Sequence, residues 1–276
     1  MIELKEVNTE KEINIDIASV LGEPKEEKVE IDDDIEIILI KLPNKILGQK
    51  SSEIKLCGKS MADWVKLAFN TTPTEVELTE KTTVLQIAKA YAKKTYTAVF
   101  FSDTPLLSKK VFAACLNYVK NRGLNVACFD RGYIFITSAL QTLKVLPSIP
   151  LSSFAKLQEF FVVDDVNKLM LAEKFLRKRI IDYHIKNGVH FLDESTCIIE
   201  CDVVLGQNVE IWGGNVLRGK TKIGNDTILF PNNYIEDSSI GSKCKILNSI
   251  VRASKIKDNS ELPPQTCVEK GIINKR

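Results

Sequence analysis

The sequence offers little of what metal or nucleophilic chemistry requires. Its 276 residues include only two histidines, His184 and His190, and neither has an acid or a nucleophile beside it in the local sequence. The seven cysteines form no Cys-x-x-Cys pair, and no histidine stands near Cys197 and Cys201 to complete a zinc set. We therefore expect reduced, mostly buried thiols and assign neither histidine a catalytic role.

Excess charge and long apolar runs are also missing. The 38 basic and 36 acidic residues give a net charge of +2 at pH 7, so no global field attracts nucleic acid or anionic lipid. No apolar run approaches the ~20 residues of a membrane span. The first residues, MIELKEVNTEKE, lack the charged-then-apolar pattern of a signal peptide. A cytoplasmic protein without nucleic-acid or membrane partners is expected.

A six-residue period is the most informative pattern that is present. An aliphatic residue returns at every sixth position from Leu205 to Ile235, and glycine follows Leu205, Ile223 and, a little further on, Ile240. This period is typical of a left-handed parallel β-helix, in which each hexad forms one side of a triangular coil. The spacing slips to five at Ile240 and runs on to Leu262. Counted from Ile199, the pattern predicts about three and a half coils of roughly eighteen residues each.

The chain ahead of this run mixes helical periods with short β-branched runs, which indicates an α/β body. We expect strands at 35–40, 96–101, 125–129 and 133–136, and helices at 59–69, 84–93, 109–121 and 166–186. The domain organisation that follows is an acidic N-terminal arm at 1–34, an α/β domain at 35–165, a linker helix at 166–188 and a β-helix at 189–276.

One turn of the α/β domain is a candidate ligand site. Asp103 stands just past the strand expected at 96–101, in the turn Ser102-Asp103-Thr104-Pro105. Open α/β sheets bind their ligands at the carboxyl ends of strands. A ligand is therefore expected near Asp103.

The stretch from Asp165 to Asn259 contains sequences that hexads alone would not produce, such as VNKLMLAE and HIKNGV. It resembles the linker helix and early β-helix of the bacterial bifunctional UDP-N-acetylglucosamine pyrophosphorylase and glucosamine-1-phosphate acetyltransferase. Upstream, LCGKSMADWV (56–65) is similar to that family's G-K-P-M helix start, and FFSDTPLLS (100–108) to its strand ending in G-D-x-P-L. The resemblance implies a shortened nucleotidyltransferase-like (Rossmann-like) domain before the β-helix.

The resemblance also implies site residues and a cofactor. Asp103 and Asn167 match the aspartate and asparagine that hold Mg²⁺ against the nucleotide phosphates in that family. Mg²⁺ prefers such hard oxygen ligands, and it would neutralise charge as a sugar phosphate attacks the α-phosphorus. The alternative is that Asp103 and Asn167 each cap a helix. Asp130 and Gly132 fall where the family places an N-x-G motif against the sugar, with aspartate replacing the asparagine.

The sequence departs from the family in other places. The first strand should lead into a glycine-rich loop ending in arginine, whose N–H groups and guanidinium grip the triphosphate. Here residues 41–48 are KLPNKILG, and Pro43 removes an amide donor. The family's base-binding Q-L-G-T motif is missing, and the interval from Asp103 to Asn167 is much shorter. Acetyl transfer is not expected, because it needs later coils and an arginine that LPPQ at 262–265 does not supply.

Two main hypotheses follow. The chain is either a divergent sugar-1-phosphate nucleotidyltransferase that keeps Mg²⁺ and a nucleotide sugar or sugar phosphate at its site, or a non-catalytic oligomeric scaffold or regulatory subunit. Positioning and electrostatics supply almost all of phosphoryl-transfer catalysis, so the lost loop favours weak or lost nucleotidyl transfer. A hexapeptide acyltransferase is a remote third alternative. A homotrimer is expected, because the resembling family is trimeric through its β-helix and a short prism exposes edges and apolar surface.

Overall fold

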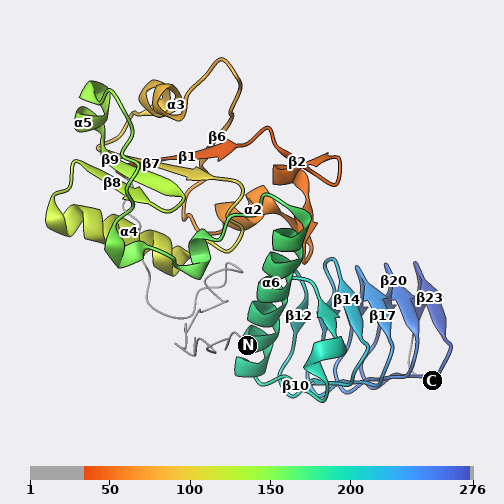
Figure 1. The fold of residues 1–276 in the computed structure, drawn as a ribbon. Coiled ribbons are helices and arrows are strands. Elements are labelled where there is room, and N and C mark those ends of the chain that lie inside the picture. Colours follow the sequence, from red (N-terminus) through yellow and green to blue (C-terminus); the bar gives the residue numbers. More distant parts are fainter. Residues whose placement is uncertain (1–33, 274–276) are drawn as a thin grey trace, which may run out of the picture.

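The computed structural model describes residues 34–273, and it shows an α/β domain joined through a long helix to a parallel β-helix (Figure 1). This confirms the expected fold class, a Rossmann-like domain followed by a short left-handed β-helix. The predicted acidic arm lies outside the described residues, apart from Asp34. Among the helices that the structure describes, none is long and apolar enough to cross a membrane.

A mixed five-stranded sheet forms the centre of the α/β domain, in the order β6-β1-β7-β9-β8. Its strands are β1 (Ile35–Lys41), β6 (Thr74–Glu77), β7 (Tyr96–Phe101), β8 (Val126–Phe129) and β9 (Gly132–Ile136). The first two pairs, β6 with β1 and β1 with β7, are parallel, whereas β9 runs antiparallel to β7 and to β8. Strand β1 is buried on both faces, which explains its continuous run of isoleucine and leucine.

Helices cover both faces of this sheet. One face packs on α2 (Met61–Lys66) and α4 (Lys109–Arg122), and the other on α3 (Val84–Tyr91) and α5 (Thr137–Thr142). The helix expected at 59–69 is shorter in the structure, spanning Met61–Lys66, and β6 and α5 lie where no strand or helix was expected. Ser60 is extended and its Oγ accepts the amide N–H of Asp63 at 3.1 Å, so it acts as an N-cap and ends a short strand instead.

Two short hairpins follow β1, where the chain has no periodic pattern. They are β2 (Lys45–Ile46) with β3 (Gln49–Lys50), and β4 (Lys55–Leu56) with β5 (Lys59–Ser60), with a 3₁₀ turn at Ser51–Glu53 between them. We refer to residues 45–60 as the hairpin segment. Further 3₁₀ turns lie at Ser152–Phe154, Gln158–Phe160 and Glu194–Thr196.

Helix α6 (Val166–Lys186) lies between the two parts of the molecule (Figure 1). The Asp165 side chain caps it by accepting the Lys168 N–H at 2.8 Å, and the chain leaves it through Asn187 and Gly188, whose φ is +84°. The buried face of α6, with Leu169, Ala172, Leu176 and Ile180, belongs to one core cluster with the hairpin segment and the interior of the β-helix.

The β-helix consists of three parallel sheets of five strands each. The first face contains β10 (His190–Phe191), β13 (Glu210–Ile211), β16 (Ile228–Leu229), β19 (Lys245–Ile246) and β22 (Glu261–Leu262). The second contains β11 (Ile198–Ile199), β14 (Val216–Arg218), β17 (Tyr234–Glu236), β20 (Ile250–Arg252) and β23 (Cys267–Glu269). The third contains β12 (Val204–Leu205), β15 (Lys222–Ile223), β18 (Ser239–Ile240), β21 (Lys255–Ile256) and β24 (Ile272–Ile273).

The hexad aliphatics point into this prism as predicted, and Ile211, Leu217 and Leu229 are fully buried. The expected length of about three and a half coils was too short, because strands continue to His190 on one side and to Ile273 on the other. At the C-terminal end Val268 and Ile273 continue the run, at spacings of six and five residues, beyond Leu262 where the count stopped.

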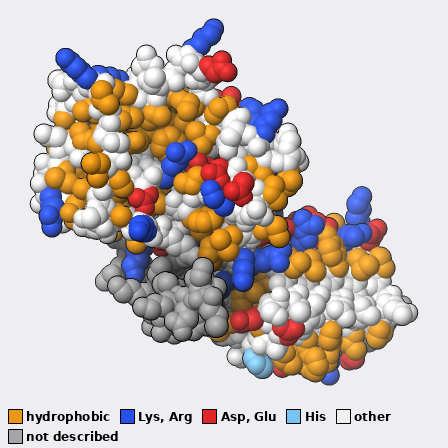
Figure 2. All heavy atoms as spheres, viewed as in Figure 1, with side chains coloured by type: hydrophobic (Ala, Val, Ile, Leu, Met, Phe, Trp, Pro, Cys, Tyr) orange, Lys and Arg blue, Asp and Glu red, His pale blue; other side chains and the backbone are white. Residues whose placement is uncertain are grey.

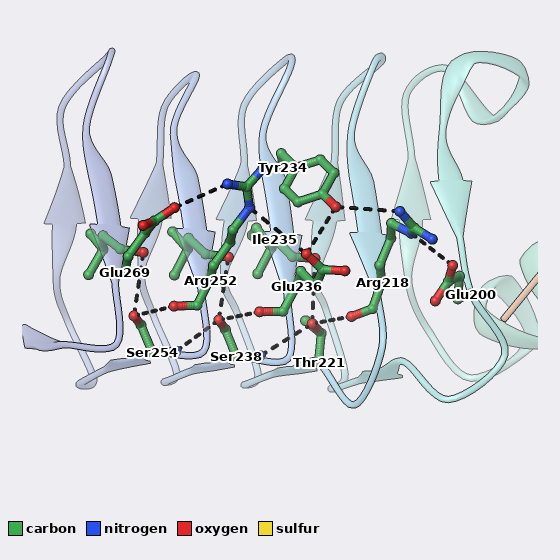
Figure 3. Close-up of polar contacts among 12 residues, drawn as sticks. Glu200, Arg218, Thr221, Tyr234, Ile235, Glu236, Ser238, Arg252, Ser254 and Glu269 are labelled. Carbon is green, nitrogen blue, oxygen red and sulfur yellow. Dashed lines mark hydrogen bonds and ion pairs between the residues drawn. The ribbon is translucent and has the colours of Figure 1, made fainter.

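Buried polar side chains fix the corners of the prism. Ser238 Oγ donates to the carbonyl of Glu236 at 2.7 Å and accepts the N–H of Ser254 at 3.1 Å, and Thr221 and Ser254 repeat this in their own coils (Figure 3). These bonds satisfy backbone groups that a tight corner leaves unpaired. The recurring glycine is also explained, since a Cβ on Gly224 would lie 2.5 Å from the backbone nitrogen of Ser242.

Truncation inside the prism should cost far more than truncation on its surface. We expect Leu229→Ala to lower the free energy of unfolding by about 2–5 kcal/mol, because it removes a buried side chain and leaves a cavity. Val204→Ala, at a position that is 47% exposed on the third face, is the matched control and should change it by less than about 1 kcal/mol. Urea unfolding measures both, and equal losses would contradict the assigned interior.

Candidate functional site

Asp103 lies where the sequence predicts a ligand, directly after β7. Asp103 is only 1% exposed, and every residue from Ser102 to Ser108 is buried. The Asp103 carbonyl accepts the N–H of Val163 at 2.8 Å, which brings the start of α6 beside the turn. The strand end and the α6 start are thus neighbours, although about sixty residues of chain separate them.

Both carboxylate oxygens of Asp103 are bound by one arginine. Arg131 donates from Nε to Oδ1 at 3.2 Å and from a terminal nitrogen to Oδ2 at 2.7 Å, the two-pronged geometry that guanidinium and carboxylate favour. Burial raises the pKa of Asp103 above its ordinary value, and the Arg131 guanidinium opposes that shift. The sequence interpretation did not assign Arg131 a role, because a pair 28 residues apart leaves no local pattern.

Asn167 lies in the first turn of α6 and is exposed, in contrast to the buried Asp103. The capping alternative is wrong for both residues, since Ser108 caps α4 and Asp165 caps α6. No group of three His, Cys, Asp or Glu side chains within residues 34–273 is arranged to hold a metal ion. With both Asp103 oxygens held by Arg131, the residues as placed do not fit Mg²⁺, and the Asp103–Asn167 metal site stays a prediction.

Asp130 and Gly132, the predicted sugar-binding pair, flank Arg131 in the turn between β8 and β9. Asp130 accepts the backbone N–H of Lys156 at 2.5 Å, which ties the turn to a distant loop. A Cβ on Gly132 would lie 2.7 Å from the Phe100 ring, so close strand packing already requires glycine there. Both residues therefore have structural roles that hold Arg131 in place, and sugar binding by them stays a prediction.

The hairpin segment occupies the position after β1 where a phosphate-binding loop is expected from the resemblance. It bonds instead to the first coil of the β-helix: the Cys57 carbonyl accepts the Cys201 N–H at 3.1 Å, and Lys59 pairs with Asp202 at 2.5 Å. The side chains of Ile54 and Leu56 are buried in the core that the hairpin segment shares with α6. The hairpin segment thus connects the α/β domain to the β-helix through hydrogen bonds, an ion pair and a shared core. We call a segment with this role a brace.

A separate recess of about 660 Å³ lies far along α6 from Asp103, between the end of that helix and the first coil. Tyr183, His184, Cys201 and Asp202 contribute to its lining. His184 is buried, its Nε2 has no hydrogen-bond partner in the described chain, and burial lowers its pKa to about 4. Its position on the buried side of α6 explains why it stays neutral.

No family model matches the chain, but curated proteins match about half of it. It is 32% identical over 134 residues to Bifunctional protein GlmU of Caldanaerobacter subterraneus subsp. tengcongensis, across 49% of this chain and 29% of that protein. It is 38% identical over 108 residues to Bifunctional protein GlmU of Clostridioides difficile, across 39% and 24%. With Bifunctional protein GlmU of Bacillus velezensis the identity is 37% over 107 residues, again across 39% and 24%. The chain thus spans less than a third of the length of these relatives, and its resemblance to them is confirmed over about half of the chain.

Acid should weaken the fold through His184. Its folded pKa of about 4 lies below the ordinary value of 6.5, so the unfolded chain binds more protons between these values. The stability contribution is fully present above pH 6.5 and is lost as the pH falls toward 4.

The variant His184→Leu removes this titration. Between pH 7 and pH 4.5 it should lose about 2 kcal/mol less unfolding free energy than the unmodified protein. His190→Leu, at an exposed histidine, is the control and should keep the full slope. An unchanged pH dependence of urea unfolding in His184→Leu would contradict the neutral, buried state.

Proposed function

We propose that the chain is a divergent homologue of the sugar-1-phosphate nucleotidyltransferases in which nucleotidyl transfer is lost or strongly reduced, and that it acts as an oligomeric scaffold. One observation carries the proposal: the segment after β1 is committed to packing. Its carbonyl at Cys57 and its lysine at Lys59 are used by the β-helix, and its side chains at Ile46, Ile54 and Leu56 fill the core around α6.

Catalysis of phosphoryl transfer depends on donors held in place around the phosphates. A loop that serves this purpose presents several backbone N–H groups to solvent, where a triphosphate can reach them. The Ser51 amide in the hairpin segment donates to the Asn44 carbonyl at 3.1 Å, and the Met61 amide, directly after the segment, donates to the Ile54 carbonyl at 2.9 Å. These donors are therefore consumed by the local fold, which supports weak or absent transfer.

The second part of the proposal concerns the β-helix, which we propose forms a homotrimer. Apolar side chains form two columns on either side of the corner between the first and second faces. We call these columns the apolar stripe; they contain Leu192, Trp212, Phe230, Leu247 and Pro263 on one side, and Ile198, Val216, Tyr234, Ile250 and Cys267 on the other. Figure 2 shows hydrophobic side chains gathered in bands along the β-helix. Soluble proteins usually cover such continuous apolar surface.

A column of charged residues lies next to the apolar stripe, and its internal pairing supports the proposal that other copies of the chain cover the stripe. Glu200, Arg218, Glu236, Arg252 and Glu269 follow one another along the second face with alternating sign (Figure 3). Arg218 pairs with Glu200 at 2.8 Å, and Arg252 pairs with Glu269 at 3.1 Å. Because these charges are partnered within the chain, a second copy can approach the apolar stripe without leaving a charge unpaired.

Residual binding of a nucleotide sugar with Mg²⁺ is the alternative for the α/β domain. It depends on Asp103 and Asn167, which keep the residue types and the order of the family's metal ligands. Pyrophosphate release distinguishes the two hypotheses.

With UTP, N-acetylglucosamine-1-phosphate and Mg²⁺, we expect pyrophosphate release at least about 10³-fold slower than that of Bifunctional protein GlmU of Clostridioides difficile measured alongside. Loss of one oriented donor already costs about 10²–10³ in rate, and here a whole loop is replaced. Robust release that disappears in Asp103→Ala would contradict the proposal and establish the metal site.

Sedimentation velocity at micromolar concentration should show a trimer. Ile250→Glu, at a position that is 40% exposed in the apolar stripe, should weaken association at least tenfold, because it buries a charge. Val204→Glu, 47% exposed on the lysine-containing third face, is the matched control and should leave the trimer intact. A stable monomer would contradict the trimer, and disruption by the control alone would move the interface to the third face.

A further inference from the structure

We infer that the guanidinium of Arg131 has taken the place of a divalent metal ion at Asp103. The buried carboxylate at the carboxyl end of β7 is thus paired with a cation of the chain itself and does not bind a metal ion. The inference deepens the proposed function, because it takes Asp103 as the residue corresponding to a metal ligand. It does not depend on whether any turnover remains.

The geometry of the pair is the first support. Arg131 uses two donors on two oxygens, at 3.2 and 2.7 Å, and the carboxylate side chain is 2% exposed against 31% for the arginine. A buried carboxylate needs a cation close to it. The guanidinium supplies one that is covalently part of the chain and always charged.

The second support is that neighbouring residues hold the Arg131 side chain in position. Its guanidinium carbon lies 4.3 Å from the centre of the Phe101 ring, so the side chain is stacked as well as paired. The turn that carries it is fixed by the Asp130 bond to the Lys156 N–H and by the close contact of Gly132 with Phe100. Arg131 is thus held over Asp103 by its neighbours on the strand end and in the turn.

Local charge balance is the third support. Asp164, whose charge raises the pKa of Asp103, pairs with Lys168 at 2.6 Å. Asp165 is used as the cap of α6. Asp103 and Asp164 therefore each have a cationic partner, Arg131 and Lys168, which leaves a single negative charge among the three carboxylates that a divalent ion would overcompensate.

Binding of Mn²⁺ to the full-length chain, followed by electron paramagnetic resonance of the free ion, tests the inference. The unmodified protein should show no binding that depends on Asp103. Arg131→Ala should bind Mn²⁺ at least tenfold more tightly, because both oxygens are released, and the double variant Arg131→Ala/Asp103→Asn should lose that gain.

Arg122→Ala is the matched control, because Arg122 also stacks on an aromatic ring, that of Tyr118, and its removal changes the charge equally. It should bind no more Mn²⁺ than the unmodified protein. If Arg131→Ala fails to fold, Arg131→Gln removes the positive charge and frees one carboxylate oxygen, and it should also bind Mn²⁺ more tightly than the unmodified protein. Asp103-dependent Mn²⁺ binding in the unmodified protein, or no gain in a folded Arg131 variant, would overturn the inference. Turnover is not measured, so failure here leaves the pyrophosphate result to decide the proposed function separately.

Discussion

The structure depends on helix α6 packing at the same time against the hairpin segment and against the first coil of the β-helix. Its apolar residues contact the hairpin segment of the α/β domain and close the first coil of the β-helix within a single core. An open end of a β-helix exposes unpaired strand edges and interior side chains, which must be covered. Here α6 and the hairpin segment provide the cover, and Cys57 and Lys59 add a backbone bond and an ion pair to it.

This arrangement constrains the chemistry that the α/β domain can perform. A segment cannot both seal the end of the β-helix and wrap around a nucleotide triphosphate, because the same amides and side chains would be required twice. In the turn after β7, the charged groups are likewise already used in contacts within the chain. Asp103 is buried and held by Arg131, and the neighbouring Asp164 is held by Lys168. The two regions that the resemblance assigns to phosphate binding are both closed by contacts within the chain.

The sequence predicted those parts of the fold whose pattern is repetitive or long. The inward aliphatics around Leu229 and the glycine at Gly224 predicted the prism, and the helix at 166–186 was placed with its true bounds. The hairpin segment could not be predicted, because its strands are two residues long and have no period. Arg131 was missed for a different reason: its partner is brought to it only when β7 and β9 pair, and no local spacing reports such a contact.

Hydrogen–deuterium exchange of the hairpin segment tests the central claim most directly, which is that this segment is a brace and not a phosphate loop. The amide of Ser51 in this segment, and the amides of Met61 and Cys201 that donate to its carbonyls, should exchange slowly in the free protein, because each is bonded within the chain. Saturating UTP with Mg²⁺ should leave their rates unchanged. Fast exchange in the free protein that becomes slow on addition of UTP and Mg²⁺ would show that the segment opens to bind the nucleotide, and would contradict the account.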